Sequence, residues 1–194
     1  MSLTEEASRS IQGAWGLLRR DPAAPQAFNA TPAGAWRSFA AAFVLLPLYL
    51  AYRSYAGPSP DTEQASPFAR WSLIVLVYAI SWTLWPLLAF YLTRAMGCGE
   101  RFLGYVAAYN WSQLLTGPFV FGVGMAAKAG MEAEFASLVT FAALAAALFY
   151  EYLIARQMLA IPPARAALMV FATLVTVELL GGLSDLALQL SGAP

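Results

Sequence analysis

One carboxylate stands inside an apolar segment near the C-terminus and is the residue best suited to chemistry. Glu178 interrupts a hydrophobic run over residues 164–190, and lies about 12 to 14 residues, roughly 18–21 Å, into that run at 1.5 Å per residue. A carboxylate at such a depth in a bilayer costs a few kcal/mol and is by default a functional-site hypothesis. It requires a proton, neutral polar partners, a water-filled cavity or a pairing with another subunit.

Further polar and small residues share a helical face with Glu178. Gly181, Gly182, Asp185 and Gln189 follow it at +3, +4, +7 and +11, which places all of them within about 60° on a helix. The segment therefore has one continuous polar and small-residue stripe, and Asp185 joins Glu178 as a candidate site residue.

A second polar group lies in residues 102–127, a stretch without any charged residue. Asn110 and Gln113 fall about 12–16 Å from one end of it, close to the depth of Glu178. We therefore predict that Gln113 or a tyrosine such as Tyr109 hydrogen-bonds Glu178 across a helix interface. Three interpretations remain open: polar contacts that hold helices together, a proton- or solute-handling site, and an interface to another protein.

Glu151 and Cys98 also carry reactive groups, but we expect both to have structural roles. Glu151, between Tyr150 and Tyr152 near one end of the segment 133–155, is expected to lie at the membrane interface or to meet Arg156. Cys98, the only cysteine, is expected to fill a short glycine-containing turn.

The composition excludes several classes of protein. Apolar residues make up 60% of the chain and charged residues only 11%, against about 25% in soluble domains. The net charge is zero, so no electrostatic footprint for nucleic acid exists. The absence of histidine and the single cysteine argue against haem, zinc and copper sites. We expect no cofactor, no metal and no catalytic residue, since no hydrolase, metalloprotease or phosphate-loop motif occurs.

The apolar runs predict an all-α, polytopic integral membrane protein. Each run is long enough for a helix to cross a hydrocarbon core of about 30 Å. Prolines inside three of them predict kinks. The five predicted spans cover about residues 36–55, 70–93, 102–127, 133–155 and 164–190.

The first 35 residues form a separate, more polar segment. Ser2 and Glu5 fit a capping box, and Ala7, Ile11, Trp15 and Leu18 recur at helical spacing. This pattern predicts a short amphipathic helix in the membrane interface, anchored by Trp15. An ordinary helix packed on the membrane domain explains the pattern equally well.

The distribution of basic residues predicts an orientation. Eight of the eleven lie on the side of the N-terminus: Arg9, Arg19, Arg20, Arg37, Arg94, Arg101, Arg156 and Arg165. Arg53, Arg70 and Lys128 lie on the other side. The positive-inside rule then puts the N-terminus in the cytoplasm and the C-terminus outside; arginine and alanine richness suggests a bacterial inner membrane.

This arrangement resembles the Yip family (Ypt-interacting-protein type) of five-span membrane domains. The segment from Ala95 to Tyr109 resembles the bacterial members' connection between spans two and three, with a glycine-rich turn, an aromatic residue, and then a small residue and tyrosine. Pro118 follows, as a proline does in that pattern. Eukaryotic members are implicated in membrane trafficking and contact small GTPases, whereas bacterial members share no firm activity from which residue roles follow.

The sequence thus favours a non-enzymatic scaffold or accessory subunit that organises a membrane complex or membrane lipids. Its expected partners are lipids and other membrane subunits, or further copies of itself. The alternative is an oligomeric transporter or channel for a proton or small solute, acting through polar residues around Glu178.

Overall fold

The computed structural model describes residues 2–57 and 65–192, and within these ranges every regular element is a helix. Most of the predicted solvated loop 57–69 lies outside the described residues. In chain order the elements are α1 (Leu3–Leu18), the 3-10 helix η1 (Ala24–Ala27), α2 (Pro32–Ser38), α3 (Ala40–Ala56), α4 (Pro67–Ala95), the 3-10 helix η3 (Gly99–Arg101), α5 (Phe102–Lys128), α6 (Ala133–Leu159) and α7 (Pro163–Gly192).

Four helical segments are long and apolar enough to cross a membrane: Pro32–Ala56, which joins α2 and α3, then α4, α6 and Pro163–Leu190 of α7. The prediction of an all-helical chain is confirmed for the described residues, and these four segments are candidate membrane spans by length and composition. α5 is long enough but is not among the four, because polar and small residues dilute its hydrophobicity. The fifth span therefore stays a prediction.

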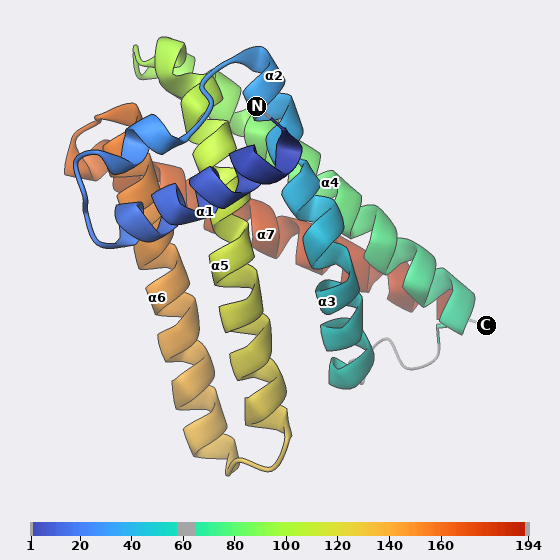
Figure 1. Ribbon diagram of the computed structural model, residues 1–194. Helices are drawn as coiled ribbons and strands as arrows, with labels where there is room; N and C mark the ends of the chain where they lie inside the picture. Colours follow the sequence, from blue (N-terminus) through green and yellow to red (C-terminus); the bar gives the residue numbers. More distant parts are fainter. Residues whose placement is uncertain (1, 58–64, 193–194) are drawn as a thin grey trace.

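α5 is nevertheless the central helix. It packs against α6, α3, α1, α2 and α4, and Figure 1 shows it crossed by α1 and flanked by α6 and α3. Most residues of its N-terminal half up to Ser112 are buried, including Tyr105, Asn110 and Trp111. Gly117 brings α5 close to α3, because a Cβ there would lie only 3.0 Å from Leu45. The long helix that is not among the four candidate spans is thus the one that most other helices contact.

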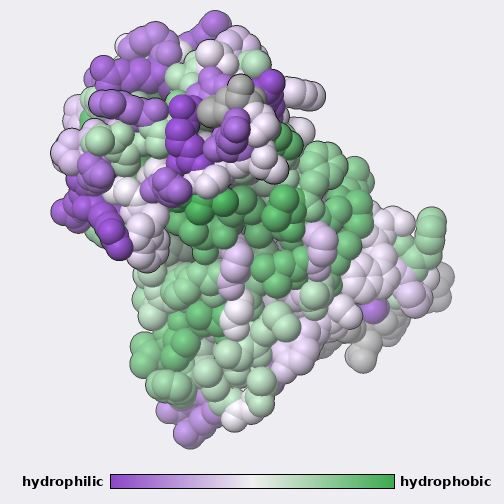
Figure 2. All heavy atoms as spheres, viewed as in Figure 1, coloured by the Kyte–Doolittle hydropathy of each residue, from purple (hydrophilic) through white to green (hydrophobic). Residues whose placement is uncertain are grey.

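The surface is divided into a polar end and an apolar belt. On the face shown in Figure 2, hydrophilic residues gather over the N-terminal segment and the adjoining helix ends, and hydrophobic residues cover the helices beyond them. Large apolar side chains are exposed in this belt, among them Phe43, Leu138 and Phe171. Such extensive apolar exposure fits helices that face lipid rather than water.

The N-terminal helix packs on the helical bundle through a face that the apolar spacing does not reveal. The predicted capping box is present, with Glu5 N–H donating to Ser2 Oγ at 3.2 Å and Ser2 N–H to Glu5 Oε2 at 2.8 Å. The buried face of α1 consists of Glu6, Ser10, Gly13, Ala14 and Leu17.

Two side chains of α6 help to hold α1 in place. Tyr150 donates to the Ala14 carbonyl at 2.6 Å, and Gln157 donates to the Leu17 carbonyl at 2.8 Å. α1 is therefore packed on the helical bundle, as the second explanation of its apolar spacing expects. Trp15 is 48% exposed, so its role as an interface anchor stays a prediction.

Basic side chains donate hydrogen bonds to carbonyl groups at three helix C-termini, where these groups lack partners within the helix. The pairs are Arg101 with the Leu159 carbonyl (3.2 Å), Arg165 with the Met96 carbonyl (3.0 Å) and Lys128 with the Ala56 carbonyl (2.7 Å). Each bond joins two elements that are distant in sequence, and each places a positive charge at the negative end of a helix dipole.

The contact between α1 and η1 predicts the effect of adding one methyl group. A Cβ at Gly13 would lie 2.6 Å from the Ala27 Cβ, so Gly13→Ala is expected to destabilise the protein by about 1–3 kcal/mol. Gly122→Ala is the matched control, because nothing lies within 4 Å of its added Cβ; it should be neutral or stabilising by up to about 1 kcal/mol. Thermal unfolding of both purified variants, followed by circular dichroism, measures the difference. Equal melting temperatures would contradict the packing described.

Removing the hydroxyl of Tyr150 tests how α1 is held. Besides the Ala14 carbonyl, that hydroxyl bonds Ser112 Oγ at 3.1 Å. Tyr150→Phe is therefore expected to weaken the packing of α1 by about 1–3 kcal/mol, and to accelerate amide hydrogen exchange in residues 3–18. Tyr55→Phe, at a site 47% exposed, should leave exchange unchanged. Unchanged exchange in Tyr150→Phe would show that the hydroxyl does not hold α1.

Candidate functional site

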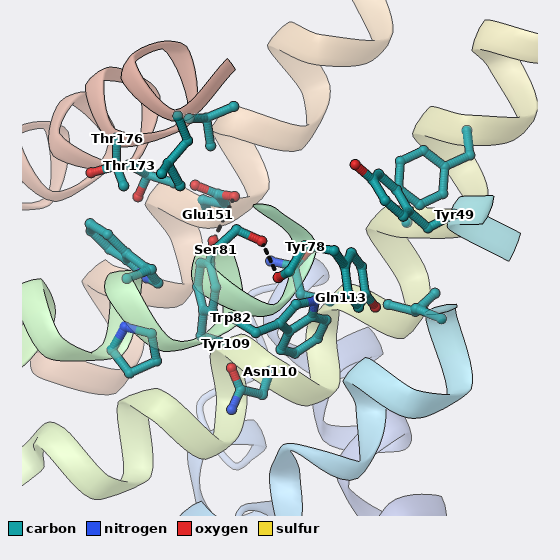
Figure 3. A pocket seen from close by; sticks show the side chains of 17 residues that line it. Tyr49, Tyr78, Ser81, Trp82, Tyr109, Asn110, Gln113, Glu151, Thr173 and Thr176 are labelled. Carbon is teal, nitrogen blue, oxygen red and sulfur yellow. Dashed lines mark hydrogen bonds between the residues drawn. The ribbon is translucent and has the colours of Figure 1, made fainter. Parts of the chain in front are cut away.

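A cavity of about 280 Å³ lies among α3, α4, α5, α6 and α7. Figure 3 shows side chains of these helices converging on it. The lining residues are Leu45, Tyr49, Tyr78, Ser81, Trp82, Trp85, Pro86, Tyr109, Asn110, Gln113, Gly117, Phe121, Glu151, Thr173, Thr176, Val177 and Leu180. We call this cavity the interhelical pocket. Its walls are mainly apolar and aromatic with a few polar groups, as is typical of ligand sites.

Glu151 is the only charged residue that lines the interhelical pocket within the described ranges. The Tyr109 hydroxyl donates to its Oε1 across a long 3.4 Å contact. Its Oε2 is buried and has no hydrogen-bond partner in the described part of the chain. The Thr173 hydroxyl lies beside the carboxylate (Figure 3) and interacts with it, and it donates to the Met169 carbonyl at 3.2 Å. The carboxylate therefore contacts hydroxyl groups but no cationic side chain among the described lining residues.

Aromatic rings form most of the wall opposite α6 and α7. Tyr49 and Tyr78 stack with their ring centroids 4.7 Å apart, and Trp82 lies 6.0 Å from Tyr78. Trp85 and Tyr109 are 5.8 Å apart. The Tyr78 hydroxyl donates to the Ala42 carbonyl at 2.6 Å, which fixes the ring between α3 and α4. The aromatic wall is thus held by contacts that do not involve a ligand.

Three of the predicted site residues meet in this pocket. Tyr109 and Asn110, with Gln113 one turn further along α5, all line it. Asn110 also donates to Ser38 Oγ at 2.9 Å, which ties α5 to α2. Gln113 accepts a hydrogen bond from Thr116 at 2.9 Å, on its own helix.

Glu178 and Asp185 do not join them. Both are exposed, and neither lines the interhelical pocket. The face of α7 toward the pocket carries residues 173, 176, 177 and 180, whereas the Glu178 stripe lies about 150° away at 100° per residue. The expected hydrogen bond from Gln113 or Tyr109 to Glu178 is thus replaced by the Tyr109–Glu151 contact.

The stripe on α7 is open over its whole length. Glu178, Gly181, Gly182, Asp185 and Gln189 are all exposed. Nothing lies within 4 Å of a Cβ added at either glycine. We call this face the outer stripe of α7.

Glu151 lies farther from the end of its helix than expected, and its expected pairing with Arg156 is wrong. α6 continues to Leu159, four residues beyond the predicted end of that span, so Glu151 lies about 12 Å from the helix end rather than about 6 Å. Arg156 does not pair with Glu151 but donates to the Ile161 carbonyl at 2.7 Å. Pro162-Pro163 marks the end of the helix in the sequence, and extending the predicted span toward it would have placed Glu151 farther from the helix end.

Cys98 lies at the polar end, in the turn between α4 and η3. It is buried and free of disulfide bonding. Burial raises the pKa of its thiol, which lowers the thiolate fraction and hence its nucleophilicity. These properties favour the predicted role as a turn filler.

Comparison of the chain with protein-family models, with curated proteins and with solved structures finds no match. The resemblance to the Yip family therefore stays a prediction. In the described ranges, no group of three or more histidine, cysteine, aspartate or glutamate side chains is placed to hold a metal ion.

The buried acid without a cationic partner predicts an unusual stability effect. Replacing Glu151 by glutamine removes a buried ionisable group, and the amide oxygen can still accept from Tyr109. Glu151→Gln is therefore expected to raise the free energy of unfolding by about 1–3 kcal/mol.

Thermal unfolding in one detergent measures this effect, and Glu134→Gln provides the control. Glu134 lies on the same helix, in the exposed first turn of α6. Its substitution should change stability by less than about 0.5 kcal/mol. A lower melting temperature for Glu151→Gln would show that the carboxylate is well paired.

Proposed function

We propose that this chain is a non-enzymatic integral membrane protein that serves as an accessory subunit, binding a transmembrane helix of another membrane protein along the outer stripe of α7. The observation that carries the proposal is the exposure of Glu178 in the apolar belt. It lies about 22 Å along α7 from Pro163 at 1.5 Å per residue, a depth at which a carboxylate facing lipid is costly.

The shape of the outer stripe suits a helix. Gly181 and Gly182 leave the backbone accessible beside Glu178. Small residues of this kind allow close approach of helix backbones in membranes, and polar side chains then hydrogen-bond across the interface. The stripe therefore offers both a shallow groove and a carboxylate acceptor.

Charge complementarity favours a different protein over a second copy. A symmetric contact between two copies would bring two Glu178 carboxylates together, which is unfavourable unless they share a proton. A partner helix with a basic or hydroxyl side chain opposite Glu178 satisfies the carboxylate directly. We therefore commit to a partner subunit rather than to a homodimer.

The proposal includes five spans, with α5 as the enclosed one, in a bacterial inner membrane. The N-terminus lies in the cytoplasm and the C-terminus outside. Support comes from the excess of arginine at the end of the bundle that carries α1, and from the polar character of that end (Figure 2). A scaffold of Yip type has this same organisation.

A second candidate function rests on the interhelical pocket. Transport or sensing of a proton or small solute requires an intramembrane polar site, and Glu151 with Tyr109 supplies one where Glu178 was expected to. Five spans are few for a monomeric carrier, so this function also requires oligomerisation.

Site-specific photo-crosslinking tests the accessory-subunit proposal. A photoreactive residue replaces Gly182 in the full chain, expressed in its native membrane. The expected product is a heterologous adduct whose crosslinked peptide belongs to a transmembrane helix with a basic or hydroxyl residue. Leu138 of α6, which is 63% exposed, is the control position and should give lipid adducts only.

Three results would overturn the proposal. Lipid adducts alone at Gly182 would leave the outer stripe without a protein partner. A crosslink between two copies of this chain would assign the stripe to self-association. A partner helix that lacks basic and hydroxyl residues would remove the role of Glu178.

A further inference from the structure

We propose that the interhelical pocket binds a small organic cation, an alkylated ammonium, with Glu151 as its counter-ion and the aromatic rings of α3, α4 and α5 as its wall. This inference concerns the inner face of α7 and the residues around it. It is independent of the outer stripe, so either proposal can fail without the other.

The carboxylate needs a positive partner that this chain does not provide at the pocket. No lysine or arginine is among the described lining residues, and Glu151 Oε2 is buried without a hydrogen-bond partner there. An unpaired buried charge is costly, whereas a paired one is tolerated. A cation in the interhelical pocket would offset the cost of burying the ionised carboxylate. That offset contributes to the binding free energy of the cation.

The aromatic lining favours a cation over a neutral ligand. Six aromatic residues line the pocket: Tyr49, Tyr78, Trp82, Trp85, Tyr109 and Phe121. The face of an aromatic ring attracts a cation within about 6 Å of the ring centroid, with about 0.5–2 kcal/mol per contact. Rings combined with a carboxylate are the recognition chemistry of quaternary ammonium groups, because alkyl substituents pack on the rings while the charge faces the acid.

The volume and the polar lining of the interhelical pocket restrict the class of ligand further. The volume of about 280 Å³ lies at the lower limit of ligand pockets, which are about 300 Å³ or larger. Neutral polar side chains, including Ser81, Gln113 and Thr176, also line the cavity and can bond a hydroxyl or carbonyl on the ligand. An alkylated ammonium with one short polar arm fits these features.

Choline and its neutral carbon isostere, 3,3-dimethyl-1-butanol, test the proposal in the wild-type protein. The full chain is reconstituted in phosphatidylglycerol nanodiscs, which contain no choline, and binding is measured by isothermal titration calorimetry. Choline is expected to bind about tenfold tighter than the isostere, or more, because only the cation gains the carboxylate and ring contacts. Equal affinity, or no binding of choline, would overturn the proposal without any variant.

Two variants assign the effect to the named residues. Glu151→Gln should lower choline affinity about tenfold or more and leave the isostere unchanged. Trp82→Leu should weaken choline binding by about threefold or more, and Trp82→Phe should restore most of it because a ring is retained. Glu134→Gln is the control and should bind as the wild type does. Full choline affinity in Glu151→Gln would contradict the role of the carboxylate.

A further experiment distinguishes a lipid headgroup from a free ammonium compound as the natural ligand. In nanodiscs that also contain phosphatidylcholine, competition that weakens choline binding identifies a lipid headgroup as the natural ligand. Unchanged binding identifies a free ammonium compound.

Discussion

The packing depends on one constraint: polar groups buried inside the helical bundle need hydrogen-bond partners on neighbouring helices. α5 carries several of these groups, and residues of α2 and α6 bond them. Asn110 bonds Ser38 of α2, and Ser112 bonds Tyr150 of α6, which in turn reaches α1. The N-terminal segment is therefore part of the packed bundle. The Arg37–Glu6 ion pair at 3.2 Å joins α1 to α2 in the same way.

The sequence predicts the helices well because its signals are local. Prolines and capping residues mark helix starts at Pro32, Pro67 and Pro163, so these boundaries lie within a few residues of the predictions. The position of α5 at the centre also follows from its polar residues, which are unsuited to lipid. Tertiary effects are harder to foresee. The buried face of α1 is set by small residues and by Glu6, whose partners lie on other helices.

The site is predicted in part, because helical periodicity groups residues without orienting them. The spacing from Glu178 to Gln189 correctly places five residues on one face of α7, and the structure shows that this face is exposed. Periodicity cannot state which way a face points, since that depends on packing against α4 and α6. Tyr109, Asn110 and Gln113 line the interhelical pocket as a group, but the carboxylate beside them is that of Glu151 and not of Glu178. Glu151 was not predicted there because α6 is longer than the predicted span.

The basic residues at the helix ends have a consequence for how this protein can evolve. Arg101 and Arg165 belong to the charge bias from which the orientation is predicted, and the same side chains bond the carbonyls at the ends of α6 and α4. If that prediction holds, replacing either arginine weakens the orientation signal and also removes a hydrogen bond from one helix terminus. The two requirements act on the same side chains, so neither arginine can change for one of them without affecting the other.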